Sequence, residues 1–244
     1  VLLQGAGILA ISFFMVKPTL PKGVVAAPRI VMTMGYDTVA QMRRSPIFWF
    51  TYLLFVAVAA GGLMATAQLG PIAKDYGLAK MPISLFGITV LPLLTLTLVI
   101  DNLANGFTRP LCGFISDRIG RENTMLIVFV GEGLALLGLM QFGHNPYAFM
   151  TFAALVFLCW GEIYSIFPAL CADTFGVKNA AANAGTLYTA KGTASLLVPF
   201  ASVLSAGGNW DRVFIFAAVI SIGAGLAAKW AHAPMRAPWI AESN

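Results

Sequence analysis

The stretch AGTLYTAKGTASLLVPF, residues 184–200, carries one charge, Lys191, in a run that otherwise has the composition of a membrane helix. A second cation, Arg109, lies in another apolar run. A cation at the centre of a bilayer costs at least about 2.5 to 3.5 kcal/mol, so each needs a partner or water. Arginine offers a planar fork that matches a carboxylate, and lysine offers a compact charge on a flexible stem. The two types together suit the binding of an anion.

Polar and aromatic residues accompany the cations at helical spacing. They form three stripes, each on one helix face: Asp101, Asn105 and Arg109; Trp160, Tyr164 and Pro168; and Tyr188, Lys191 and Ser195. Counted from the expected helix ends, Arg109, Tyr164 and Lys191 all lie about 12 Å inside. We therefore expect the three helices to form one wall of a substrate cavity. Its predicted substrate-binding residues are Arg109, Lys191, Tyr164, Trp160, Asn105, Tyr188 and Ser195.

Three acidic residues in apolar runs, Asp101, Glu132 and Glu162, leave alternatives open. Asp101 lies about 12 Å from Arg109 along the same helix, too far for direct contact. Glu132 could pair with one of the two cations, or a carboxyl desolvated in the membrane could carry a proton. Glu162 is about 200° around the helix from Tyr164 and should face away from the cavity if Tyr164 faces it. All three are candidate proton-coupling groups.

Both cations also have a structural interpretation. Lys191 could extend its side chain to the membrane surface instead of entering a cavity. Arg109 could form an ion pair with an acidic residue on another helix. Either arrangement would leave the anion site without one of its two charges.

The composition indicates how these residues are positioned. The chain of 244 residues is 59% hydrophobic and 10% charged, whereas soluble domains carry roughly 25% charged residues. Its mean hydropathy is +0.82. This is the composition of an integral, multi-pass membrane protein in contact with the lipid bilayer. The apolar runs do not alternate with polar residues as barrel strands do, so the predicted fold is all-α.

Seven apolar segments are expected to be helices: 1–16, 47–67, 82–112, 124–142, 146–171, 183–206 and 212–231. All but the first have the length needed to cross a bilayer, about 20 residues. One orientation gives the cytoplasmic side most of the basic residues: Lys17, Lys22, Arg29, Arg43, Arg44, Arg118, Arg121, Lys178, Lys229 and Arg236. The other side receives only Lys74, Lys80 and Arg212. The rule that cytoplasmic loops are positive selects this orientation. Small residues in the expected spans should let the helix backbones approach closely: Gly61, Gly62, Gly185, Gly192, Gly223 and Gly225.

Other classes of function find little support. The spacing of Cys112, Cys159 and Cys171 fits neither a metal site nor a disulfide framework. His144 and His232 lie in a loop and near the end of the chain, and no HExxH or GxSxG pattern occurs. The basic residues form no stripe interleaved with aromatic residues. We therefore expect no enzymatic activity, no cofactor or metal, and no nucleic-acid partner.

A charged loop, GFISDRIGRE, joins two apolar runs at Gly113–Glu122. Gly113 should permit a close helix crossing, and Asp117 can accept hydrogen bonds from helix-end amides or an arginine. Arg118 and Arg121 should hold the loop at the level of the lipid headgroups. The spacing of Gly113, Asp117, Arg118, Gly120 and Arg121 resembles the cytoplasmic loop signature of the major facilitator superfamily.

The resemblance implies a domain organisation. In that family the signature occurs once in each six-helix half. Residues 1–16 would then be the truncated end of helix 6, residues 17–46 the central cytoplasmic loop, and residues 47–231 helices 7 to 12 of the C-terminal half. Residues 232–244 would form a cytoplasmic tail. An N-terminal half of the same chain would be the partner that supplies the other part of the binding site.

Four stretches narrow the resemblance: AQMRRSPIFW, NGFTRPLCGFISDRIGR, CWGEIYSIFPALCADTFG and LYTAKGTAS are similar to the oxalate:formate antiporter group. In that group an arginine of helix 8 and a lysine of helix 11 bind carboxylates, and aromatic residues of helix 10 enclose them. The corresponding positions are Arg109, Lys191, Trp160 and Tyr164. Asp101 and Glu162 depart from the group's pattern, which leaves the exact anion open.

The resemblance implies a secondary transporter that exchanges small carboxylate anions, such as oxalate and formate, by alternating access in a bacterial inner membrane. One alternative is a proton-coupled symporter or exporter of another small solute. Another is a signalling receptor built on a transporter scaffold.

Overall fold

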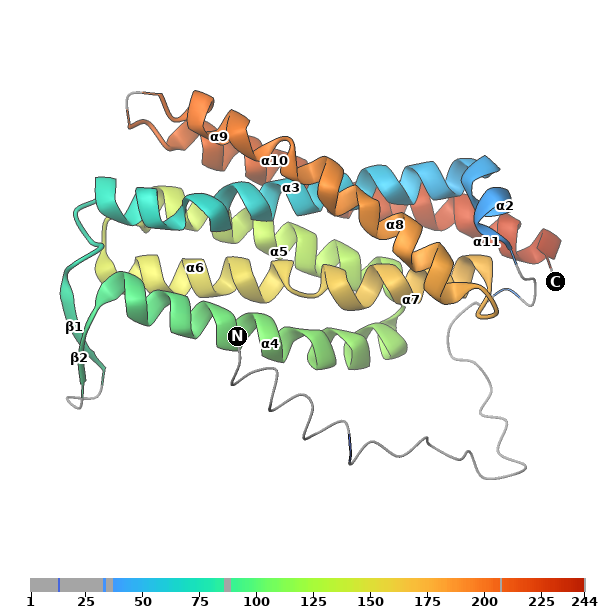
Figure 1. Cartoon of the computed structure of the whole chain (residues 1–244), viewed down its shortest axis with the longest axis horizontal. Coiled ribbons are helices and arrows are strands. Elements are labelled where there is room, and N and C mark those ends of the chain that lie inside the picture. Colours follow the sequence, from blue (N-terminus) through green and yellow to red (C-terminus); the bar gives the residue numbers. More distant parts are fainter. Residues whose placement is uncertain (1–12, 14–32, 34–36, 86–88, 207, 244) are drawn as a thin grey trace.

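The computed structural model describes residues 13, 33, 37–85, 89–206 and 208–243, and most of these form helices that lie side by side along the long axis (Figure 1). A short helix, α2 (Val39–Arg44), precedes them. The described residues form six long helical rods: α3 (Pro46–Asp75), α4 (Leu93–Ile119), α5 (Arg121–Phe142), α6 with α7 (Pro146–Trp160, Ile163–Phe175), α8 with α9 (Ala180–Ser195, Val198–Leu204), and α10 with η1 and α11 (Asp211–Ala227, Ala228–His232, Ala233–Ser243). The predicted all-α class is confirmed.

Five of these rods are long and apolar enough to cross a membrane: residues Pro46–Asp75, Arg121–Phe142, Pro146–Phe175, Ala180–Leu204 and Asp211–Glu242. The remaining rod, α4, has 27 residues, which is sufficient length. Its hydropathy is lowered by Asp101, Arg109, Asp117 and Arg118. The protein is thus a multi-pass membrane protein in which the most polar rod carries one of the two cations of interest.

The prediction of a helix from residue 82 onward is wrong. Two strands, β1 (Pro82–Leu85) and β2 (Thr89–Pro92), pair in antiparallel fashion there, and Pro82 lies opposite Pro92. A proline pushes the residue before it into extended backbone, and Ile83 and Thr89 are β-branched, which favours strands. Composition alone did not separate this hairpin from the helix, which begins at Leu93 and continues to Ile119.

The boundaries at both ends of the chain also differ from expectation. Helical structure continues past residue 231 through the π-helical turn η1 into α11, so the predicted tail at 232–244 is largely helical. The helix predicted at 47–67 is α3, which runs from Pro46 to Asp75. It begins at Pro46 because Ser45 caps it by accepting a hydrogen bond from the Phe48 amide at 3.2 Å. The predicted helix at 1–16, except residue 13, and the linker up to residue 36, except residue 33, lie outside the described residues.

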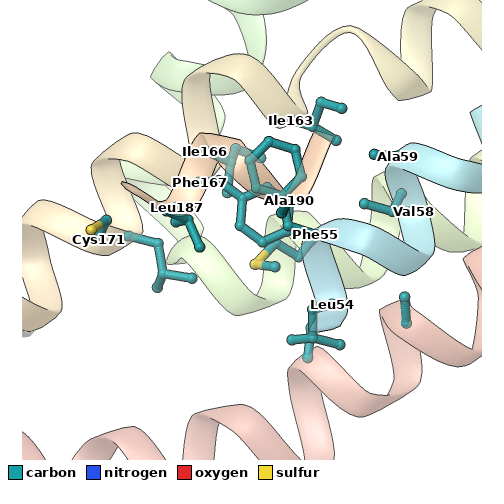
Figure 2. Close-up of a cluster of buried hydrophobic side chains, with 14 of the residues drawn as sticks. Leu54, Phe55, Val58, Ala59, Ile163, Ile166, Phe167, Cys171, Leu187 and Ala190 are labelled. Atoms are coloured by element: carbon teal, nitrogen blue, oxygen red, sulfur yellow. The ribbon is translucent and has the colours of Figure 1, made fainter. Parts of the chain in front are cut away.

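A buried apolar cluster joins α3, α7 and α8 (Figure 2). The rings of Phe55 on α3 and Phe167 on α7 stack with centroids 4.3 Å apart, and Leu187 and Ala190 of α8 belong to the same cluster. Phe55 also meets the ring of Tyr188 on α8 edge-on at 5.7 Å. This packing fixes the rotation of α8, and with it the direction of the neighbouring Lys191.

Glycines allow some of the helices to approach closely, as predicted. A β carbon on Gly61 would lie 2.5 Å from the Ser221 hydroxyl of α10, and one on Gly62 would overlap the Trp160 ring. Gly225 is similarly packed against α5. By contrast, a β carbon on the predicted contact residues Gly185, Gly192 and Gly223 would meet no described atom within 4 Å.

Candidate substrate-binding site

The rod formed by α6 and α7 is interrupted at Gly161 and Glu162, and a second irregularity follows at Pro168. Proline has no amide hydrogen, so the carbonyl four residues earlier, that of Tyr164, receives no bond from it. The hydroxyl of Tyr188 donates to this carbonyl at 2.9 Å. Because of Pro168, the Tyr164 carbonyl is free to accept this hydrogen bond, which links α8 to α7.

The ring of Tyr164 lies beside both membrane-embedded cations. The guanidinium carbon of Arg109 on α4 is 5.0 Å from the ring centroid, and the Nζ of Lys191 on α8 is 4.8 Å from it. The guanidinium carbon of Arg109 and the Nζ of Lys191 are therefore no more than 9.8 Å apart. Both contacts have the range of cation–π interactions, about 6 Å or less. Three helices bring Arg109, Tyr164 and Lys191 to one place, as their predicted depths require.

Within the part of the chain that the structure describes, the two cations lack acidic partners. Arg109 donates to the side-chain oxygen of Asn105, one turn earlier, at 3.2 Å. Among the described residues, neither Arg109 nor Lys191 forms an ion pair with a carboxylate. Both residues are exposed, on a face of α4 and α8 that no described helix covers. Arg109 thus has no acidic structural partner within this part of the chain. The Lys191 amine lies beside the Tyr164 ring and does not extend along its helix to the membrane surface.

Aromatic residues complete the wall around Tyr164. Trp160 meets the Tyr164 ring edge-on at 5.7 Å, and Tyr188 stacks on it at 6.2 Å with an interplanar angle of 6°. The indole Nε1 of Trp160 and the hydroxyl of Tyr164 are buried, and neither has a hydrogen-bond partner among the described residues. A buried donor without an acceptor is unfavourable. The Trp160 Nε1 lies against the α3 backbone at Gly62, so the two aromatic residues contribute their rings to the wall.

Ser195 and the three acidic residues are placed differently from the aromatic wall. The Ser195 hydroxyl donates to the Gly192 carbonyl of its own helix at 2.7 Å. Asp101, Glu132 and Glu162 are fully buried, and their carboxyl oxygens have no hydrogen-bond partner among the described residues. Glu132 therefore does not pair with Arg109 or Lys191 in this structure.

Gly62 holds a role in the site that the sequence did not assign to it. It was predicted only as a helix contact, and its partner is the indole of Trp160, which packs directly on the α3 backbone. The Gly-Gly pair in an apolar run signalled a close crossing, but nothing in the sequence identified the residue on the other side. Gly62 sets how far Trp160 can lie from Tyr164.

We expect Gly62→Ala to displace the Trp160 ring and to destabilise the protein by about 1 to 3 kcal/mol, because the added methyl would overlap the indole. Thermal unfolding in detergent measures the change. Gly185→Ala is the matched control, since its β carbon meets no described atom within 4 Å and alanine favours the helix. Equal melting temperatures for the two variants would contradict the packing described.

The charged segment Gly113–Glu122, predicted as a loop, is instead the end of α4, Gly120 and the start of α5, and it forms an ion-pair cluster in which Arg121 and Asp173 are buried and Asp117 is exposed. Arg121 pairs with Asp117 at 2.6 Å and with Asp173 of α7 at 2.9 Å. Gly120, with φ of +94°, joins α4 to α5 in a backbone conformation that favours glycine. The cluster ties the end of α7 to the α4–α5 turn.

Two expectations for this loop were wrong. Arg121 is 7% exposed and bonded on both sides, so it does not lie among the headgroups. Gly113 makes no close crossing with the described helices, since a β carbon there would meet nothing within 4 Å. Arg118, whose guanidinium lies 3.8 Å from the Phe114 ring centroid, remains on the exposed side.

Comparison with known proteins identifies the family. Residues 92–242 match the Major Facilitator Superfamily. The oxalate:formate antiporter of Oxalobacter formigenes is 32% identical over 223 residues, which is 90% of this chain and 50% of the antiporter. The chain belongs to the major facilitator superfamily.

Other members of the superfamily are similar over shorter stretches. The MFS-type transporter YhjX of Escherichia coli K12 is 27% identical over 72% of this chain and 41% of its own length. An MFS-type transporter of Gibberella moniliformis is 31% identical over 52% of this chain and 31% of its own length. This major facilitator chain thus spans half the length of the bacterial antiporter, or less than half of the other two relatives.

Proposed function

We propose that this major facilitator chain supplies one wall of a site that binds small organic anions, such as oxalate and formate, for exchange across a bacterial inner membrane. The observation that carries the proposal is the meeting of Arg109 and Lys191 over the ring of Tyr164, without an acidic partner among the described residues. Two membrane-embedded cations need negative charge, and an anionic substrate provides it. The oxalate:formate antiporter relative supports the same class of substrate.

The donors around Tyr164 suit a dicarboxylate. The fork of Arg109 can hold one carboxylate through two parallel hydrogen bonds, and the flexible amine of Lys191 can reach the other. The rings of Trp160 and Tyr164, which meet edge-on, would form the wall against which the anion lies. A monocarboxylate would satisfy only one cation at a time, which is consistent with exchange between a divalent and a monovalent anion. The cargo undergoes no chemical change, so the proposed activity is transport and not catalysis.

A second six-helix half would form the other wall, against the exposed side of α4 and α8 where Arg109 and Lys191 lie. The two halves would move about a site near the middle of the membrane, opening it to each side in turn. The site as described is open on that side. Transport should therefore require both halves.

Flux measurements in lipid vesicles test this arrangement. We expect vesicles containing residues 1–244 alone to show no exchange of labelled oxalate above protein-free vesicles, because the site has one wall. A full-length transporter that carries this chain as one half should exchange oxalate. Exchange by the chain alone at the full-length rate would contradict the two-half arrangement, and a full-length protein that binds oxalate without any flux would indicate a receptor.

A further inference from the structure

Two glutamates lie in the protein interior behind the anion site. Glu132 is on α5, and Glu162 occupies the break between α6 and α7; both are fully buried and without hydrogen-bond partners among the described residues. An ionised carboxylate in such surroundings is unfavourable by many kcal/mol unless it is paired, and protonation relieves that penalty. The anion site described above uses neither residue.

The surroundings of Glu132 contain a further unsatisfied polar group. The position that a β carbon on Gly61 would occupy lies 3.5 Å from Oε1 of Glu132 and 2.5 Å from the hydroxyl of Ser221. Ser221 is fully buried, and its hydroxyl also lacks a hydrogen-bond partner among the described residues. A carboxyl and a hydroxyl from α5 and α10 thus point to one small region beside the α3 backbone.

The described groups that face the two carboxyls are all acidic or neutral. Glu132 and Glu162 lie close enough to interact electrostatically with each other, and the remaining titratable neighbours are Cys112 of α4 and Cys159 of α6. From α10 comes the Ser221 hydroxyl, and from α3 the two glycines at 61 and 62. Neither carboxyl forms an ion pair with an arginine, lysine or histidine among the described residues. A proton is the ligand that neutralises these groups without adding volume to packed helices.

The two glutamates are joined to the anion site through the break in the α6–α7 rod. Glu162 stands between Trp160 and Tyr164 in the chain, and Gly161 packs on Asn105, the residue that accepts a hydrogen bond from Arg109. On the other side, Gly61 meets Glu132 while the adjacent Gly62 meets Trp160. A charge that appears on either carboxyl therefore acts on residues that contact the anion site directly.

We propose that Glu162 and Glu132 form a proton-binding site behind the anion site, and that anions bind more tightly when it is protonated. The inference rests on the proposed anion site. Each carboxylate takes one proton from solvent to become a carboxylic acid and returns that proton when it ionises. The negative charge left by ionisation repels a bound anion. Because such coupling is reciprocal, anion binding also favours proton binding, so the affinity of the exchanger for its anion would depend on pH.

Oxalate titrations of the full-length protein in detergent, between about pH 5 and 9, test the proposal. We expect the affinity of the parent to fall at least about fivefold as pH rises, which is the lower range of coupling between linked sites. Glu162→Gln should bind oxalate with little dependence on pH, since its side chain stays neutral, and Glu132→Gln should reduce the dependence. Glu242→Gln, on the exposed end of α11, should keep the behaviour of the parent.

An oxalate affinity that does not change with pH in the parent, but is lost in Lys191→Gln, would overturn the proton site and leave the anion site intact. Dependence on sodium instead of pH would also overturn it. Infrared spectroscopy gives a readout that needs no anion, because a protonated carboxyl has its own carbonyl stretch. That band should be present near neutral pH and weaken in both Gln variants. If oxalate fails to bind at any pH, the anion site is wrong, and an unchanged band in both variants would refute the proton site as well.

Discussion

Replacing Lys191 by glutamine in the full-length protein should weaken oxalate binding by about 30-fold or more, corresponding to about 2 to 5 kcal/mol for a lost charge-assisted contact at a desolvated site. Arg109→Gln should have an effect of the same size, since its guanidinium approaches the same ring from α4. Lys191→Arg keeps the charge but replaces a compact amine by a larger planar fork, so it should bind poorly or prefer a different anion. Isothermal titration of the purified variants provides the affinities.

The control for this series is Lys80→Gln, because Lys80 lies on the exposed surface before the β1–β2 hairpin, beside Leu94 at the start of α4 and far along that helix from Arg109. It should bind oxalate as the parent does. The proposed anion site loses its physical basis if Lys191→Gln and Arg109→Gln both retain the parent affinity for oxalate and formate.

Arg121→Gln is expected to destabilise the protein by about 3 to 5 kcal/mol. The substitution removes the cation between Asp117 and Asp173, and Asp173 is only 5% exposed. Removing one partner of a buried ion pair leaves the other charge buried without its hydrogen-bonded cation, and only the more distant Arg236 would still favour the Asp173 carboxylate. The melting temperature of the variant in detergent should fall by many degrees, and the ends of α4, α5 and α7 should become accessible to proteases.

A neighbouring arginine of the same loop supplies the comparison. Arg118 is exposed and packs on the Phe114 ring, so Arg118→Gln should lower the stability by no more than about 1 kcal/mol. If both variants melt at the same temperature, the burial of Arg121 is not what holds this end of the bundle together.

The sequence was most informative where cations interrupt apolar runs. Counting residues from the helix ends placed Arg109, Tyr164 and Lys191 at one depth, and the structure brings both cations to the Tyr164 ring. Depth is predictable because the rise of a helix per residue is constant. Which residues meet across helices is not predictable in this way, because it depends on how each rod is rotated about its axis. Examples are the contact of Gly62 with Trp160 and the hydrogen bond from the Tyr188 hydroxyl to the Tyr164 carbonyl.

Local backbone effects account for the boundaries that the sequence did not yield. The segments that form β1 and β2 are as apolar as a helix, and only their prolines and β-branched residues distinguish them from one. Arg121 was expected at the membrane surface because it lies in a charged loop, yet Asp173, far away in the sequence, draws it into the interior. Partners of this kind are supplied by tertiary structure.

A structure of the full-length protein with oxalate bound would test the central proposal most directly. One carboxylate should lie within hydrogen-bonding distance of the Arg109 guanidinium and the other within reach of the Lys191 Nζ, with the anion beside the ring of Tyr164. An oxalate bound elsewhere, with both cations still in contact with the Tyr164 ring, would contradict the proposed site.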